Sequence, residues 1–187
     1  MRHLALLSAI TMICSSANAQ TGAGGFVYGK DHAYFLEAPK GWVMASADAA
    51  KEKVGAVFHP ASAHWPESGV IVYTDFYKKK KGLETPADAM RIDVALFQKD
   101  GSTVHAVKKP SMKTNIGGLV GEVYYFGPDQ RGQFDARAYF TYQGYIDYFV
   151  LTARDKATFE KSLPAFEHIV RSYAPQIKVI HDAPKKT

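Results

Sequence analysis

The stretch "FDARAYFTYQGYIDYFVLTA", residues 134–153, contains two apolar, aromatic-rich runs separated by a Gln-Gly pair. A period of two is typical of a β-strand, and unequal faces are typical of an antiparallel sheet whose two sides are covered differently. The Gln143-Gly144 pair predicts a turn that joins the two runs as a hairpin. The first run places two sets of side chains on opposite faces: Phe134, Ala136, Ala138, Phe140 and Tyr142 on one, and Asp135, Arg137, Tyr139 and Thr141 on the other.

The residues after this hairpin predict a helix that lies on the sheet. Asp155 is a suitable N-cap residue, and Pro164 inside the helix is expected to bend it. An apolar stripe recurs at helical spacing in residues 154–175 and consists of Phe159, Leu163, Phe166, Val170 and Tyr173.

A second helix is expected over residues 85–101. Thr85 can cap it, Pro86 occupies the first turn, and Asp88 completes a Thr-x-x-Asp capping box. Its apolar side is expected to carry Ala87, Met90, Val94 and Phe97, and its solvent side Arg91, Asp93 and Lys99.

The remaining elements are predicted as strands. Two short strands are expected in residues 26–45 around a turn at residues 29–31, and the other strands are expected at residues 54–60, 69–77, 104–109 and 117–126. Hairpins dominate this order, so the fold class is α+β with a mostly antiparallel sheet and two main helices.

The segment "FLEAPKGW", residues 35–42, and the helix ending "IVRSY", residues 169–173, resemble the PsbP-like family, which includes the bacterial PsbP and DcrB-like exported proteins. The similarity covers roughly residues 26–174. It implies an α/β/α sandwich with a central, mostly antiparallel sheet. It also implies a non-catalytic role, because family members are mostly extrinsic subunits of the oxygen-evolving complex, small periplasmic or lipoprotein accessory factors, and adaptors.

The N-terminus has the layout of a secretory signal peptide. Residues 4–13 are mostly apolar, and "ANA" at residues 17–19 predicts cleavage after Ala19. Cys14 is the only cysteine, and Ile13 stands where a lipoprotein signal needs a small residue, so no lipid anchor is expected. We expect a signal peptide at 1–19, a flexible leader at 20–25, a single domain at 26–174 and a loose tail at 175–187. The mature protein would be periplasmic or secreted, with no transmembrane anchor.

Composition narrows the class of protein. The mature chain of about 168 residues would contain no disulfide, so eleven Phe and eleven Tyr must provide its core. Cleavage removes one arginine and no acid, so the formal charge falls from +5 to about +4. This charge is too small to indicate nucleic acid as a partner.

The segment "VFHPASAHWPESG", residues 57–69, carries His59, His64 and Glu67, which are ligand types for zinc or manganese. No HExxH motif is present, and prolines stiffen the segment without directing ligands inward, so these residues are weak metal candidates and no metal is predicted. Trp65 is expected to fold onto the sheet edge and to contact a partner.

Lys78, Lys79, Lys80 and Lys81 are expected to form an exposed turn, because four adjacent ammonium groups repel one another. Such a turn can hold anionic headgroups or an acidic protein. Together with the segment from His59 to Glu67, it flanks one strand, so the two candidate contact loops should lie at opposite ends of that strand.

The sequence gives little support for a catalytic or cofactor-binding motif. Residues 24–31 nearly match a phosphate-binding loop, but Asp31 replaces the Ser or Thr that would bind magnesium. No Gly-x-Ser-x-Gly motif occurs, and no cofactor is predicted. The leading hypothesis is an exported, non-catalytic accessory protein that binds a protein or envelope-surface partner. The alternatives are a metal-dependent hydrolase that uses His59 and His64, and a small-ligand carrier that uses the tyrosine-rich sheet.

Overall fold

A computed structural model describes residues 24–28, 33–63 and 67–176. Within these ranges the chain forms ten strands and three helices. The helices are α1 (Ser46–Glu52), α2 (Pro86–Lys99) and α3 (Lys156–Ser172). The strands are β1 (Gly24–Tyr28), β2 (Ala33–Glu37), β3 (Trp42–Met44), β4 (Ala56–Pro60), β5 (Val70–Lys78), β6 (Val107–Lys113), β7 (Val120–Phe126), β8 (Phe134–Tyr142), β9 (Tyr145–Ala153) and β10 (Ala174–Gln176).

The strands form two antiparallel sheets. Seven strands make the larger sheet, in the order β3-β4-β5-β9-β8-β7-β6, and three make the smaller sheet, in the order β1-β2-β10. Every pairing between these strands is antiparallel. The expected α+β class with an antiparallel sheet is therefore confirmed.

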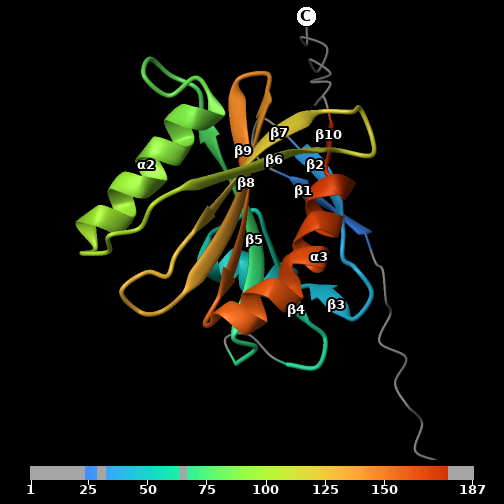
Figure 1. Ribbon diagram of the computed structural model, residues 1–187. Coiled ribbons are helices and arrows are strands. Elements are labelled where there is room, and N and C mark those ends of the chain that lie inside the picture. Colours follow the sequence, from blue (N-terminus) through green and yellow to red (C-terminus); the bar gives the residue numbers. More distant parts are fainter. Residues whose placement is uncertain (1–23, 29–32, 64–66, 177–187) are drawn as a thin grey trace, which may run out of the picture.

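Three layers result from this arrangement (Figure 1). Helix α2 lies on one side of the larger sheet, and α3 lies on the other side together with the smaller sheet. Two apolar cores follow, one between the sheet and α3 and one between the sheet and α2. This arrangement is the expected sandwich, with the smaller sheet as an additional part of one outer layer.

The hairpin β8-β9 is the centre of the larger sheet. Its nine-residue strands pair from Phe134 opposite Ala153 to Tyr142 opposite Tyr145, and Gln143 in the turn has a positive φ of 48°. Ala136, Ala138 and Phe140 on one face enter the α3 core, while Tyr139 on the other face enters the α2 core. The predicted alternation is confirmed, and both faces are buried.

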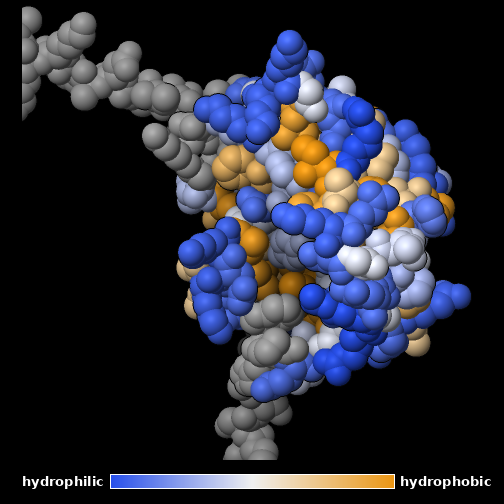
Figure 2. All heavy atoms as spheres, turned by 90° about the vertical axis from the view of Figure 1, so that its left-hand side faces the viewer, coloured by the Kyte–Doolittle hydropathy of each residue, from blue (hydrophilic) through white to orange (hydrophobic). Residues whose placement is uncertain are grey.

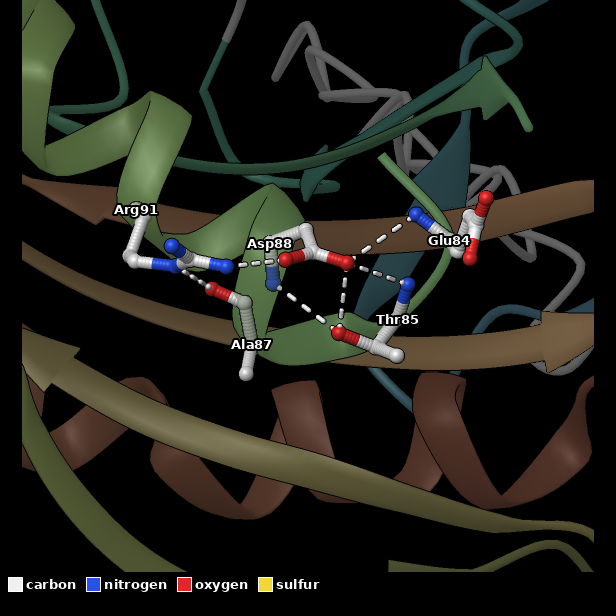
Figure 3. Close-up of polar contacts among 5 residues, drawn as sticks. All are labelled: Glu84, Thr85, Ala87, Asp88 and Arg91. Atoms are coloured by element: carbon white, nitrogen blue, oxygen red, sulfur yellow. Dashed lines mark hydrogen bonds and ion pairs between the residues drawn. The ribbon is translucent and has the colours of Figure 1, made fainter. Parts of the chain in front are cut away.

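Helix α2 begins at the predicted capping box (Figure 3). The hydroxyl of Thr85 accepts a hydrogen bond from the backbone N–H of Asp88, and the Asp88 carboxylate accepts bonds from the N–H groups of Thr85 and Glu84. The same carboxylate pairs with Arg91 one turn later. Helix α3 is capped as predicted by Asp155, which accepts the N–H of Thr158 at 2.8 Å.

Four local features differ from the sequence prediction. Helix α1 was not predicted; only Ala49 in it is buried, so its sequence lacks the apolar stripe that identifies a helix. Strand β1 begins at Gly24 and therefore includes two residues assigned to the leader. Strand β6 begins at Val107 and continues through Pro110 to Lys113 with a register shift. The first residues assigned to the tail pair with β2 as part of β10.

Candidate functional site

The predicted histidine site is only partly within the described residues. His59 lies in β4 and is 7% exposed; its Nδ1 is 3.0 Å from the Pro60 carbonyl oxygen, and its Nε2 is 3.9 Å from the Asp48 carboxylate of α1. Placing His59 in an exposed contact loop was therefore wrong, because its ring packs toward α1. Glu67 is exposed, whereas His64 and Trp65 lie outside the described residues. In the described ranges, no three His, Cys, Asp or Glu side chains gather closely enough to hold a metal ion.

The lysine turn forms at the end of β5, as predicted. Lys78, Lys80 and Lys81 are exposed and Lys79 is half-buried. The turn is fixed by its backbone, because Lys79 donates to the Gly144 carbonyl at 2.8 Å and Lys80 pairs with the buried Leu83. None of the four lysines forms an ion pair with a described residue. The segment that joins β4 to β5 and this turn lie at opposite ends of β5, as expected.

A buried charge cluster lies beneath α2. Asp93 is 2% exposed, and its carboxylate lies 2.8 Å from Nη1 of Arg137 on β8. The same carboxylate accepts hydrogen bonds from the hydroxyls of Tyr77, at 2.8 Å, and Tyr139. Nη2 of Arg137 lies 2.9 Å from Asp135. The expectation that Asp93 faces solvent was wrong, because its carboxylate is buried against Arg137, and the carboxylate of Asp135 is buried there as well.

The cluster is enclosed by aromatic rings. The Arg137 guanidinium lies 4.9 Å from the ring centre of Phe97 and 5.3 Å from that of Phe126. Burial lowers the pKa of Arg137, but the charges of Asp93 and Asp135 more than compensate and raise it well above the ordinary value. Burial also raises the pKa of Asp135, against the opposing effect of Arg137. The cluster attaches α2 to the sheet.

The tyrosine-rich sheet is used for packing. Tyr124, Tyr139 and Tyr145 are each less than 9% exposed. Tyr173, at the end of α3, donates a hydrogen bond from its hydroxyl to Asp147 at 2.5 Å. Burial and the neighbouring Asp147 raise the pKa of Tyr173. These four rings therefore pack within the layers of the sandwich, whereas Tyr125 lines a surface cavity of about 320 Å³.

Part of the α2 side of the larger sheet is uncovered. A shallow pocket of about 240 Å³ there is lined by Val54, Val57, Ile71, Tyr73 and Glu52. Figure 2 shows that this side is mostly hydrophilic and contains a hollow in which hydrophobic atoms are visible. Burial raises the pKa of Tyr73 to about 12.

A larger cavity lies on the other side, between the smaller sheet and α1. It measures about 390 Å³ and touches Phe26, Val27 and Tyr28 of β1 as well as α1 and β5. Phe26 and Tyr28 are 52% and 76% exposed, which is unusual for aromatic side chains. At its inner end, the Tyr34 hydroxyl lies 2.8 Å from the hydroxyl of Thr74. Sequence reasoning missed this cavity, because it depends on the unpredicted helix α1.

Comparison with known proteins adds information on the fold. No family model matches the sequence, and no curated protein matches it. The solution structure of cyanobacterial PsbP (CyanoP) from Synechocystis sp. superposes with a TM-score of 0.54 over 87% of this chain and 97% of that one. The chain has a PsbP-like fold. The two sequences are 16% identical, so the PsbP likeness is evidence about the fold and not about activity.

The PsbP-like fold confirms the sandwich that the motif "FLEAPKGW" implied. In the structure this segment forms the end of β2, the turn and the start of β3, and the Trp42 N–H donates to the Pro39 carbonyl at 3.0 Å. Its glycine, Gly41, has a φ of 82°, a conformation that glycine adopts at low cost.

None of the helices in the described ranges is long and apolar enough to cross a bilayer.

Proposed function

We propose that this protein is an exported, non-catalytic accessory protein that binds an acidic protein or the envelope surface through the lysine turn, Lys78–Lys81. Export rests on the signal-peptide pattern of residues 1–19, with Gln20 as the mature N-terminus. The mature protein would act in the periplasm or outside the cell.

The observation that carries the proposal is the lysine turn itself. Its backbone is fixed by hydrogen bonds to Gly144 and Leu83, while its ammonium groups form no ion pair with a described residue. A turn with a fixed backbone and several exposed lysines attracts an anionic surface, at about 1 kcal/mol per lysine near the surface. The attraction is screened by salt, so it should be strongest at low ionic strength.

The charged groups inside the protein serve the fold. Beneath α2, the carboxylates of Asp93 and Asp135 both pair with the guanidinium of Arg137. The ring of His59 faces the carboxylate of Asp48. A non-catalytic role agrees with this use of the polar groups, because general acid-base and metal chemistry both need side chains that a substrate can reach.

The test is a pull-down from envelope extracts at low and high salt. The four lysines of the turn are replaced by glutamine, and a matched variant carries Lys40→Gln, Lys99→Gln, Lys156→Gln and Lys161→Gln, which removes the same charge from exposed sites elsewhere. We expect the turn variant to lose most low-salt capture of its partner and the matched variant to retain it. Vesicles with and without anionic lipid distinguish an envelope surface from a protein partner.

Equal capture by both variants would remove the lysine turn from the function. The export proposal is tested separately by N-terminal sequencing of protein from the periplasm or medium, where we expect Gln20 as the first residue. An intact Met1 in the cytosolic fraction would contradict it.

A further inference from the structure

A groove runs along one edge of β1. This strand pairs with β2 on one side, and no described strand pairs with its other side. The cavity of about 390 Å³ touches Phe26, Val27 and Tyr28, and a second cavity of about 280 Å³ touches Gly24 and Gly25. Successive side chains of a strand point to opposite faces, so a groove that touches all five residues must run along the backbone edge.

The two cavities are neighbours, because Met44 and Ser46 line both of them, while Ala49 and Ala50 of α1 line the larger one. Met44 reaches β1 itself, since a Cβ added to Gly25 would lie 2.8 Å from its sulfur atom. The two cavities together are called the groove. The charged residues that line the groove are Lys53 and Asp75, both in the larger cavity, and most of the other lining residues are apolar.

The edge of β1 has none of the features that prevent strand addition. The sequence of β1 is Gly-Gly-Phe-Val-Tyr, without charge or proline. By contrast, the edge strand β6 of the larger sheet carries Lys108, Lys109, Lys113 and Pro110, and a register shift interrupts it. Lysine, proline and bulges are the usual means of blocking an exposed edge. The edge of β1 that faces away from β2 therefore presents to the groove backbone donors and acceptors that no described strand pairs with.

We propose that an extended segment of a partner protein binds in this groove as a fourth strand of the smaller sheet, hydrogen-bonded to β1. Its backbone pairs with Gly24–Tyr28, and alternate apolar side chains point toward Met44 and Ala49. The groove thus selects an uncharged, extended segment with apolar side chains at every second position.

The chain's own ends fit the groove less well. If the signal peptide is cleaved after Ala19, as the proposed function holds, residues 20–23 precede Gly24, and they are too few to turn and cover a five-residue strand. At the other end of the chain, β10 leaves the sheet on the far side of β2. The inference goes beyond the proposed function, since it concerns β1 and α1 and not the lysine turn.

The peptide that serves as the probe is obtained by selection. Phage-displayed random octapeptides are selected on the immobilised mature protein, and the best sequence is synthesised with a fluorescent label for polarisation measurements. Two further versions carry N-methyl groups on alternate backbone nitrogens, one version for each of the two alternating sets. Only one set of N–H groups faces β1 in an added strand, so one version should lose binding and the other should retain it.

The position of the peptide is tested with a matched pair of variants. Ser46 is exposed and lines both cavities, whereas its neighbour Ala47 is exposed and lines neither. We expect Ser46→Trp to fill the groove and weaken binding at least about tenfold, and Ala47→Trp to leave it unchanged. Ala50→Trp is a second blocking variant in case Ser46→Trp does not fold. The lysine-turn variant should bind the peptide as the wild type does, whatever its pull-down shows.

Several results would overturn the inference. Failure to select any peptide, equal binding of the two N-methylated versions, or full binding to both blocking variants would each refute strand addition at β1. A wild-type dimer that Ser46→Trp converts to a monomer would assign the groove to a second copy of this chain. Tighter peptide binding after deletion of residues 177–187 would assign it to the chain's own C-terminal segment.

Discussion

Replacing Asp93 with alanine removes the acceptor at the centre of the charge cluster beneath α2. The carboxylate of Asp93 pairs with Arg137 and accepts the hydroxyls of Tyr77 and Tyr139. Alanine leaves Arg137, whose side chain is 11% exposed, with Asp135 as its remaining ion-pair partner in the cluster, and it leaves two tyrosine hydroxyls without their acceptor.

The expected loss of stability is large. Removal of one partner from a buried ion pair costs about 3–5 kcal/mol, because the other charge stays buried without compensation. A buried hydroxyl that loses its acceptor costs about 1–3 kcal/mol, but these costs overlap and do not add. We therefore expect Asp93→Ala to lower the free energy of unfolding by about 3–5 kcal/mol, which is a large part of the 5–15 kcal/mol that is typical of a domain.

Urea unfolding followed by far-UV circular dichroism measures this change. Arg91→Ala is the matched control, because Arg91 lies on the same helix, is exposed and pairs only at the surface with Asp88. An exposed ion pair contributes about 0–1 kcal/mol. Hydrogen exchange should also show that the amides of α2 open more readily in Asp93→Ala than in the control.

A loss below about 1 kcal/mol for Asp93→Ala would refute the view that this cluster attaches α2 to the sheet. The double-mutant cycle with Arg137→Ala provides a second check. The double variant should be more stable than the sum of the single effects predicts, by about 0.5–3 kcal/mol, because Asp93→Ala leaves Arg137 with Asp135 alone and Arg137→Ala removes the cation that faces Asp93. Strict additivity would show that the two groups do not interact.

Three further predictions concern local features. Thr85→Ala should lower the free energy of unfolding by about 1 kcal/mol through loss of the helix cap, and Thr85→Ser should retain most of it in the same urea assay. Hydrogen bonds from Glu84 and Thr85 lower the pKa of Asp88 from 3.8 to about 2, so the stability that the Asp88 carboxylate contributes is present above pH 4 and is lost as the pH falls toward 2. Asp88→Asn should therefore reduce the decrease in urea midpoint between pH 4 and pH 2. An unchanged decrease would contradict this prediction. A Cβ on Gly121 would lie 2.5 Å from the buried Phe140 ring, so Gly121→Ala should cost about 1–3 kcal/mol in thermal or urea unfolding, whereas Gly144→Ala, which meets no atom within 4 Å, should cost much less.

The sequence predicted the elements whose side chains alternate or recur regularly. A short run of residues was enough to predict the hairpin β8-β9, the capping box of α2 and the Asp155 cap of α3, because capping and strand alternation are local effects. Helix α1 could not be predicted in this way, because it buries only Ala49 and its N-cap has no side-chain hydrogen bond.

The polar residues were harder to place than the apolar ones. Asp93 was expected to face solvent because an isolated aspartate on a helix usually does. Its burial depends on Arg137, which is far away in sequence and meets it only in the folded sheet. The alternation of β8 placed Asp135 and Arg137 on the same face of the strand. This shared face was the sequence signal available for their ion pair.

The groove beside β1 depends on both kinds of long-range effect. It requires β1 at the edge of a separate sheet and α1 across from it, and neither the division into two sheets nor α1 was predicted. The local sequence indication of an accessible strand was a run of Phe26, Val27 and Tyr28 that follows two glycines and carries no charge or proline.

The smaller sheet joins the two ends of the described chain. Strand β2, near the start, is completed by β10, the last described strand, which pairs Ala174 with Phe35 and Gln176 with Ala33. This closure can form only after residues 174–176 have been synthesised. A chain that lacks them would leave one side of β2 without its β10 partner, and we expect such a chain to be cleaved by proteases more readily than one that contains them.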